Sequence, residues 1–475
     1  MPTAWCQTPG RGELPGSLGV PSASRGHPVR RCLYSCGVSN DPTPTNARRR
    51  KRAAKPSNPD LPNIYPRTAI AKLDRGRHEH RDDTFPIGEV APVVGMAESF
   101  IRRILGNVKQ LTVSDVLELL DQDAFAETFV PRSRVLDYLL SRHDASDRTT
   151  GLSDEQNWKL LQGDFMQVVD TLPEASVQCV VTSTPYWGMR IYKDSHVVKW
   201  ADGEECAFGH EQTPEGFIRH TVEVLHRLSP VLTETASIWW NLMDTYMTRT
   251  QIRSNAYEAL QAMDGRNRLK WGDHEHHRYS AGHSYIKDGE QSGIPALVAA
   301  RASRIGYYAK STITWAKIIS LPEPQNSRVS RSLEYVLHLS TQRAPKFDKA
   351  AYRRLNTTLG GRNTLYEGDK LSDVWVLPVS TGSGGHGAQF PLALPGRCIA
   401  ISTDPQDVVL DPFVGSGNTA IAALTLGRRI IGVDVSQRYL DVAEEKICEL
   451  EGRLPVAFLV EPTPIVKPRA RQKSG

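Results

Sequence analysis

The chain of 475 residues has no long apolar run and only seven cysteines. No uncharged apolar stretch reaches the roughly 18 residues that a membrane-spanning helix needs, so we expect no membrane partner. The N-terminus shows no apolar core behind its basic residues, which argues against secretion. Seven widely scattered cysteines do not suggest a disulfide framework. We therefore expect a cytoplasmic protein with free thiols.

Acidic residues are scarce only at the N-terminal end. Residues 1–95 hold 15 Lys and Arg against 8 Asp and Glu, whereas the whole chain holds 58 against 53. The rest of the chain is nearly neutral, so its charge alone does not indicate a nucleic-acid partner. Residues 1–95 also contain 13 of the 31 prolines and little hydrophobic periodicity. We expect this tail to be disordered; a nucleic-acid-binding arm built on Arg48–Arg52 is the alternative.

Methionine is absent between Met1 and Met96, and a helical pattern begins directly after Met96. This gap suggests the hypothesis that translation begins at or near Met96 and that residues 1–95 are a misassigned start. An intact-mass measurement that finds residues 1–95 in the native protein would reject it. At the other end, residues 456–475 are expected to be a flexible tail.

Two further regions follow along the chain. Residues 96–150 have helical periodicity, with Ser114 and Asp115 as a helix start, and predict a helical N-terminal segment. Residues 151–455 alternate short apolar runs with helical patterns, which indicates an α/β domain with a mostly parallel central sheet. Two polar stretches, 248–294 and 346–387, are too long for simple connectors and are candidate functional insertions. The predicted strands are Val177–Thr182, Ser237–Leu242, Thr312–Trp315, Tyr335–Leu339, Val408–Leu410 and Arg429–Val433.

A glycine turn near the C-terminus is the first motif with a chemical meaning. An apolar strand, Val408–Leu410, leads into Asp411-Pro412-Phe413-Val414-Gly415-Ser416-Gly417, and a helix rich in alanine follows. Glycines let the backbone approach a ligand at the carboxyl end of a strand. The next predicted strand ends in Asp434, whose carboxylate can accept hydrogen bonds from both ribose hydroxyls. The third glycine of the dinucleotide fingerprint is absent, because Ala420 stands there.

A polar loop after the strand Val177–Thr182 is the second motif. It reads Ser183-Thr184-Pro185-Tyr186-Trp187. The exocyclic amine of a base is a poor nucleophile, and acceptors for its N–H hydrogens help it attack. Ser183 Oγ and the Thr184 carbonyl could supply them. Pro185 stiffens the loop, and Tyr186, with Trp187 beside it, offers an aromatic face for a flipped base.

Together these motifs resemble the amino-methylating DNA methyltransferases of the permuted (beta) group, over roughly residues 158–450. In that family a Ser/Asp-Pro-Pro-Tyr loop precedes an Asp-Pro-Phe-x-Gly-Ser-Gly loop, as the corresponding loops do here. The resemblance implies a Rossmann-like S-adenosylmethionine-dependent methyltransferase fold for residues 151–455. It also implies a cofactor site of Asp164, His386, Phe390, Asp411, Phe413, Gly415, Ser416, Gly417 and Asp434, and a catalytic loop of Ser183, Thr184, Pro185 and Tyr186.

Three positions depart from the family pattern. Thr184 replaces a proline, Asn418 a threonine, and Leu333 the histidine of His-Glu-Tyr. Ser183, where adenine-N6 enzymes usually carry Asp, points to cytosine N4 as the methylated atom. Methylation of cytosine C5 needs a cysteine after proline, and no such pair occurs; Cys179 and Cys398 more plausibly fill the core.

The resemblance implies duplex DNA as substrate, with a cognate restriction endonuclease as a possible separate partner. Trp187, Arg328 and the basic residues Lys346, Arg353, Arg354 and Arg362 are the DNA-binding candidates, although a solvated loop explains the last four equally well. No metal is expected: the sulfonium is already a good leaving group, and neither the histidines at 274–277 nor Cys32 and Cys36 have zinc-site spacing.

Three other functions stay open from the sequence. The same machinery could methylate adenine N6. The three departures also fit a protein that holds the cofactor and DNA with little turnover. A nicotinamide-dependent oxidoreductase shares the strand, glycine turn and acidic residue.

Overall fold

The computed structural model describes residues 83–141, 147–189, 195–247, 283, 285–318, 327–361, 371–380 and 389–452. All of them belong to one compact unit, Tyr65–Gly475, while the other unit, Met1–Ile64, lies outside the described ranges. The predictions for residues 1–82, 453–475 and most of 248–294 also lie outside them. Within the described ranges, no helix is both long enough and apolar enough to span a bilayer.

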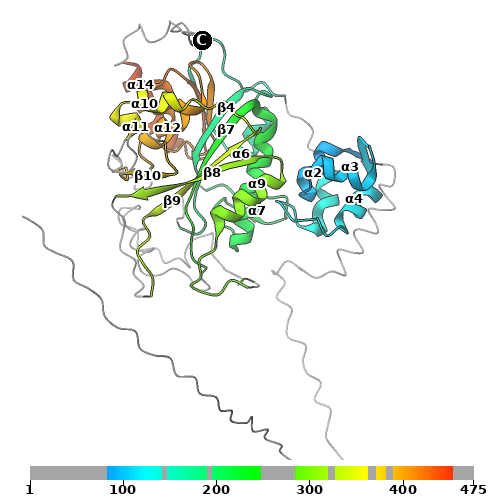
Figure 1. Cartoon of the computed structure of the whole chain (residues 1–475). Helices are drawn as coiled ribbons and strands as arrows, with labels where there is room; N and C mark the ends of the chain where they lie inside the picture. Colours follow the sequence, from blue (N-terminus) through cyan, green and yellow to red (C-terminus); the bar gives the residue numbers. More distant parts are fainter. Residues whose placement is uncertain are drawn as a thin grey trace, which may run out of the picture. The chain divides into compact units, whose positions relative to one another are not determined.

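An eight-stranded sheet forms the centre of the α/β domain (Figure 1), in the order β10-β8-β9-β7-β4-β11-β12-β3. Every neighbouring pair is parallel except the two pairs that β9 makes, with β7 and with β8. The mostly parallel α/β fold expected from the sequence is therefore confirmed. The strands are β3 (Trp158–Gln162), β4 (Val177–Ser183), β7 (Leu232–Leu242), β8 (Tyr308–Lys317), β9 (Leu333–Ser340), β10 (Val374–Leu377), β11 (Val408–Asp411) and β12 (Arg429–Asp434).

All six predicted strands are present, because uninterrupted β-branched runs suit strands that are covered on both faces. The stretch 346–387, a candidate functional insertion from its length, contains regular structure in its described part. Its residues Val374–Leu377 form the edge strand β10, paired with β8, and two short helices precede it, α10 (Lys349–Arg354) and α11 (Thr357–Gly360). A four-residue strand among polar residues has too little periodicity to recognise.

Helices cover both faces of the sheet. On one face, α7 (Pro214–Leu228) and α9 (Ile294–Arg304) pack in the same core as Val180 of β4. On the other face, α12 (Ala393–Ser402), α13 (Asn418–Thr425) and α14 (Gln437–Glu451) pack in the core that holds Val181, the next residue of β4. Figure 1 shows α7 and α9 on one side of the strands and α12 and α14 on the other. Cys179 and Cys398 are fully buried, as predicted.

The N-terminal segment is helical but begins earlier than predicted. Around a third core, which also includes Val222 of α7, it contains β1 (Thr84–Pro86), α2 (Ile87–Val94), α3 (Glu98–Leu105), β2 (Gln110–Thr112), α4 (Val113–Leu120), η1 (Arg132–Arg134) and α5 (Val135–Leu140). The residue that caps α4 is Thr112 rather than Ser114, because Thr112 and Asp115 form a reciprocal capping box. The boundary at residue 95 therefore falls after two elements of this unit.

Truncation tests where the N-terminal unit begins. Phe85, Val90, Val93 and Val94 are fully buried, and each such side chain contributes about 1.5–3 kcal/mol. Removing residues 1–95 deletes all four, so we expect this variant to lose the cooperative thermal unfolding of the unit. Removing residues 1–82 deletes none of them and serves as the control. Equal melting temperatures for the two variants would contradict this account.

Candidate active site

The two motif loops meet at the carboxyl ends of the parallel strands, which we call the carboxyl edge or active-site edge of the sheet; the opposite ends form its amino edge. β4 and β11 are parallel neighbours, with Val180 opposite Leu410. Beyond that pair, Thr182 Oγ1 donates to Asp411 Oδ1 at 2.7 Å. The loop of Ser183 and the glycine turn after Asp411 therefore start side by side from the same edge.

A hydrogen-bonded network holds the loop that follows β4. Ser183 Oγ lies 3.2 Å from Tyr186 Oη, and Asn241 Nδ2 approaches both oxygens, at 3.2 and 2.8 Å. Glu334 Oε2 accepts from Tyr186 Oη and, at 2.8 Å, from Asn241 Nδ2. Lys317 Nζ pairs with Glu334 Oε1 at 3.1 Å and compensates its charge. The network fixes where the Ser183 hydroxyl and the Tyr186 ring lie.

Asn241, Glu334 and Lys317 were not among the predicted site residues. Asn241 lies opposite Ser183 in the register of β4 with β7. Glu334 reaches the same edge because β9 runs antiparallel, so its first residues lie beside the last residues of β7 and β8. None of the three belongs to either motif loop, and only the sheet register shows that they meet there.

The remaining residues of this loop have different surroundings. Thr184 is 4% exposed, and its Oγ1 makes no hydrogen bond within the described ranges. Trp187 is fully buried, and its indole Nε1 donates to Glu211 O at 2.9 Å. The prediction that Trp187 stacks on DNA is therefore wrong, because its ring packs in the core. Pro185 lies against Gly209, where an added Cβ would come within 3.0 Å of it.

Asp411 anchors the start of the glycine turn. Its carboxylate is buried and accepts from Thr182, from Thr419 Oγ1 at 2.5 Å and from Phe413 N at 3.1 Å. Burial raises the pKa of Asp411 to about 6, and these hydrogen bonds limit the rise. The turn itself is left-handed at Gly415 and Gly417, with φ of 50° and 86°. A Cβ added at Gly415 would meet no atom within 4 Å, so the turn borders open space.

Two acidic residues lie at the carboxyl ends of the adjacent strands β12 and β3: Asp434 is the last residue of β12, and Asp164 comes two residues after β3. Asp434 Oδ2 accepts from Gly415 N and its Oδ1 from Ser436 N, both at 2.9 Å. Its carbonyl accepts from Gly163 N at 3.0 Å, which places Asp164 at the same edge. Asp164 caps the short helix α6 (Phe165–Val168) through Met166 N, and burial raises the pKa of this carboxyl. Both carboxylates thus border the edge from which the glycine turn starts.

Side chains from two other elements support the turn. Lys446 of α14 donates to the carbonyl and the hydroxyl of Ser416, at 2.9 and 3.2 Å. Asn418 Nδ2 donates to Phe390 O at 2.8 Å. Asn418, one of the departures from the family pattern, thereby ties the turn to the segment that holds Phe390. The neighbouring predicted residue His386 lies outside the described residues.

An aromatic cluster surrounds Phe413 beside the turn. Its ring stacks on Phe208 with centroids 5.3 Å apart and lies 6.5 and 6.4 Å from Phe165 and Trp240. The predicted cofactor residues among the described ranges are thus gathered at the ends of β3, β11 and β12 and in the segment before α12. They are Asp164, Phe390, Asp411, Phe413, Gly415, Ser416, Gly417 and Asp434.

Arg328 lies in the segment that enters β9 at the active-site edge. Its guanidinium stacks over the Tyr246 ring, 3.8 Å from the centroid, and Arg331 lies 5.2 Å from the same centroid. Tyr246 follows the carboxyl end of β7. Two guanidinium groups therefore lie within 5.2 Å of the centroid of one aromatic ring, and the nitrogens of Arg328 are buried.

The basic residues predicted at 346–362 do not share this location. Lys346 Nζ pairs with Asp404 and Asp407 at 2.5 and 2.8 Å, and Asp407 directly precedes β11. Lys346 therefore lies at the amino edge of the sheet, opposite the active-site edge, and its prediction as a DNA contact is wrong. Arg353 and Arg354 are exposed on α10, a helix that begins near the C-terminal end of α12, where Asp348 N donates to Ile401 O. Arg362 lies outside the described residues.

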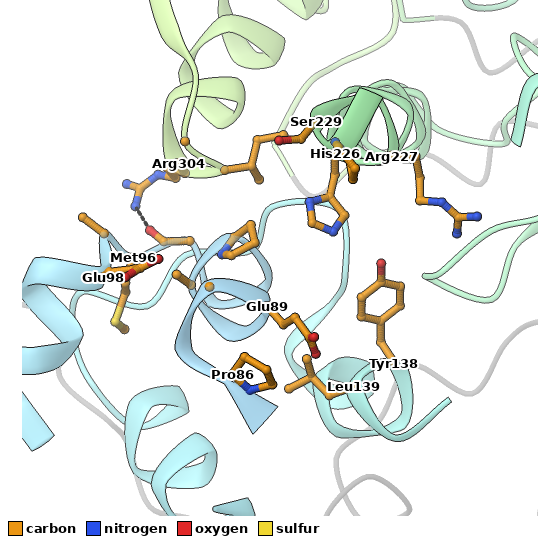
Figure 2. Close-up of a pocket in the computed structure, with 18 of the residues that line it drawn as sticks. Pro86, Glu89, Met96, Glu98, Tyr138, Leu139, His226, Arg227, Ser229 and Arg304 are labelled. Carbon is orange, nitrogen blue, oxygen red and sulfur yellow. Dashed lines mark hydrogen bonds between the residues drawn. The ribbon is translucent and has the colours of Figure 1, made fainter. Parts of the chain in front are cut away.

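A cavity of about 1200 Å³ lies away from this edge. Figure 2 shows its lining, with Glu89 of α2, Tyr138 of α5 and His226 of α7 among the labelled side chains. Pro230 and Gly306, which precede β7 and β8, also line it, so it borders the amino edge. This cavity is not the active site despite its size. It borders the amino ends of the strands, whereas the motif loops follow their carboxyl ends.

Comparison with known proteins identifies the family of this chain. Residues 177–445 match the DNA methylase family of N6 and N4 methyltransferases. The type II methyltransferase M.Cfr9I of Citrobacter freundii is 30% identical over 290 residues, 61% of this chain and 87% of that enzyme. M.SmaI of Serratia marcescens is 26% identical over 297 residues, 62% of this chain and 92% of that enzyme. The chain belongs to the N6/N4 DNA methylase family and is a DNA amino-methyltransferase.

Two solved structures are also similar. TTHA0409 from Thermus thermophilus, solved in complex with S-adenosyl-L-methionine, is 23% identical; the match covers 62% of this chain and 95% of that one, with a TM-score of 0.41. The cytosine-N4-specific PvuII DNA methyltransferase is 17% identical over 65% of this chain and 96% of that one, with a TM-score of 0.43. The fold assignment rests on the sheet described above and not on these scores.

The raised pKa of Asp411 predicts a pH dependence of stability. Its folded value of about 6 exceeds the ordinary 3.8, so the protonated form favours the folded state. Its contribution to the free energy of unfolding is full below pH 3.8 and is lost as pH rises through about 6. We expect the difference between wild type and Asp411→Asn, measured by urea unfolding, to fall by up to about 3 kcal/mol between pH 4 and 7. A difference that does not change with pH would contradict this assignment.

Proposed function

We propose that the protein transfers a methyl group from S-adenosyl-L-methionine to the exocyclic N4 of cytosine in duplex DNA. The target base leaves the stack and enters the space between the Ser183 loop and the glycine turn. Bound S-adenosyl-L-methionine would supply the methyl group for one in-line displacement by the base nitrogen, would leave as S-adenosyl-L-homocysteine, and the surplus amine proton would pass to solvent. The protein contributes chiefly positioning and electrostatic stabilisation.

The hydrogen bond between Thr182 and Asp411 carries this proposal, because it joins the points at which the Ser183 loop and the glycine turn leave their strands. Ser183 Oγ and the Thr184 carbonyl supply acceptors for the amine hydrogens. The ring of Tyr186, held at its hydroxyl by Glu334 and Asn241, supplies the stacking surface. Ser183, in place of the Asp usual in adenine-N6 enzymes, supports cytosine as the base.

The residues present fit the cofactor. Asp434 offers its carboxylate next to the open space at Gly415, as recognition of a ribose requires. Asn241 Oδ1 and Gln389 Nε2 are buried and make no hydrogen bond within the described ranges. Buried polar atoms of this kind usually have a partner, and a polar ligand at this edge would provide one. When bound, the cofactor would supply the activated methyl group, and Asp164 and Phe413 would also help to hold it.

Methylation of DNA with labelled cofactor tests the proposal. The treated DNA is digested to nucleosides, and the labelled nucleoside is identified by mass spectrometry, with Ser183→Ala as the matched control. We expect N4-methylcytosine from the wild type. N6-methyladenine would overturn the choice of base but keep the class of enzyme. No transfer by protein that binds the cofactor would instead favour the alternative of a cofactor- and DNA-binding protein without turnover.

A further inference from the structure

A cluster of metal-ligating side chains lies outside the methyl-transfer site. The hairpin of β5 (Val198–Lys199) and β6 (Glu205–Cys206) carries Asp202, Glu204 and Cys206, which face His220 of α7. His220 Nε2 lies 3.2 Å from Asp202 Oδ1 and 3.9 Å from Glu204 Oε2. The ligand atoms of Glu204, Cys206 and His220 all lie within 4.8 Å of one another. Three potential ligands therefore lie close together, and Asp202 adjoins them through His220 Nε2.

These separations suit a tetrahedral ion. Bonds of about 2.0–2.3 Å to oxygen, nitrogen and sulfur place neighbouring ligand atoms roughly 3.3–3.7 Å apart. The distances from His220 Nε2 to Asp202 and Glu204, 3.2 and 3.9 Å, straddle that range, and binding an ion would draw the Cys206 thiolate and both carboxylates closer together. One thiol and one imidazole among the ligands favour zinc over magnesium or calcium, which prefer oxygen alone.

Glu211, which is not one of the possible ligands, gives a second and independent indication of a metal ion. His220 Nδ1, the ring nitrogen on the other side, lies 3.1 Å from Glu211 Oε1. Histidines that bind metal commonly donate this second N–H to a carboxylate, which fixes the tautomer. Glu211 is fully buried, and its Oε2 makes no hydrogen bond within the described ranges. A buried carboxylate with an oxygen unsatisfied is costly unless nearby positive charge compensates it.

The local charge balance also favours a cation. Asp202, Glu204 and Glu211 contribute three carboxylates, and the nearest basic partner is Arg219, whose Nε donates to Asp202 Oδ2 at 2.8 Å. Even a protonated His220 would leave this region negative. Glu204 and Cys206 are only partly buried, which leaves a route from solvent to the cluster.

We propose that Asp202, Glu204, Cys206 and His220 bind one structural zinc ion, with Glu211 orienting His220. Four protein ligands leave no open position, so the ion takes no part in the reaction. It would instead brace the catalytic loop. Gly188 N donates to Gly209 O at 2.9 Å, Trp187 Nε1 donates to Glu211 O, and Gly209 N donates to Glu211 Oε1. Through these bonds the cluster supports the segment that follows Tyr186.

Metal binding by the full-length protein tests this site. The protein is stripped with a chelator, and Zn²⁺ or Co²⁺ is then added while metal content, melting temperature and absorption spectrum are measured. We expect one equivalent per chain, a higher melting temperature with Zn²⁺, and a thiolate-to-cobalt charge-transfer band. Folded wild type without stoichiometric metal and without the band would overturn the proposal and leave His220 as an imidazolium between two carboxylates.

Variants assign the ligands. Cys206→Ser should abolish the charge-transfer band, while Cys448→Ser, at an exposed cysteine, and the pair Cys32→Ser with Cys36→Ser should leave it unchanged. Loss of the band in either control, with retention in Cys206→Ser, would overturn the assignment. Glu211→Gln should weaken Zn²⁺ affinity about 10- to 100-fold and keep the band. This second variant tests the site even if Cys206→Ser fails to fold; unchanged affinity in it would contradict the orienting role.

Discussion

Replacing Tyr186 by alanine is expected to lower the single-turnover rate of methyl transfer to DNA by about 100-fold or more. The substitution removes the proposed stacking surface and the hydroxyl that joins Ser183, Asn241 and Glu334. Ser183→Ala should have an effect of similar size, because it removes an acceptor for the amine. Cofactor affinity, measured by calorimetry, should stay within about threefold of wild type in both variants, since neither residue belongs to the glycine turn.

Tyr186→Phe is the matched control for the ring. It keeps the aromatic face and removes only the hydroxyl, so we expect a loss of about tenfold, between wild type and Tyr186→Ala. Wild-type methylation by the alanine variant would refute the assignment of this residue. A large loss of cofactor affinity would show that the loop supports the cofactor site instead.

The second large effect is expected at Gly417, where the backbone has a φ of 86° and lies against α14. A Cβ there would come within 2.8 Å of Ala443 Cβ and 3.1 Å of its Cα. Because Ala443 belongs to the helix that packs under the turn, the turn or the helix must shift. We expect Gly417→Ala to lower cofactor affinity at least tenfold and to cost about 2–4 kcal/mol of stability.

Gly427→Ala separates the collision from backbone strain. Gly427 also has a positive φ, 70°, but an added Cβ there meets no atom within 4 Å. It should therefore lose only about 1 kcal/mol and keep normal cofactor affinity. Equal effects of the two substitutions would mean that contact with Ala443 does not shape the turn.

The sequence predicts the centre of this site well because local patterns determine it. Apolar β-branched runs identify β4 and β11, and polar loops directly follow both strands. Parallel neighbours present their carboxyl ends at one edge, so the two loops meet because β4 and β11 are adjacent, which the structure and not the local pattern shows. Asp434 follows from the same rule, applied to the next strand.

What the sequence misses depends on contacts between distant residues. Glu334 joins the Ser183 loop only because β9 is antiparallel, which its own residues do not reveal. Lys346 is a basic residue before a helix, and only the fold shows that it pairs with Asp407 at the opposite edge. Trp187 adjoins the catalytic loop, yet its indole turns inward to Glu211. The cluster at His220 draws on a hairpin and a helix that no spacing rule connects.

A structure of the protein with sinefungin, in which an amine replaces the reactive methyl-sulfonium centre, tests the central claim most directly. We predict that the ligand binds at the carboxyl edge, between the turn at Gly415 and the Ser183 loop. Its ribose should lie at Asp434, and its amine should face the Ser183 loop. Ligand bound instead at the amino edge, in the cavity lined by Glu89 and His226, would contradict the account.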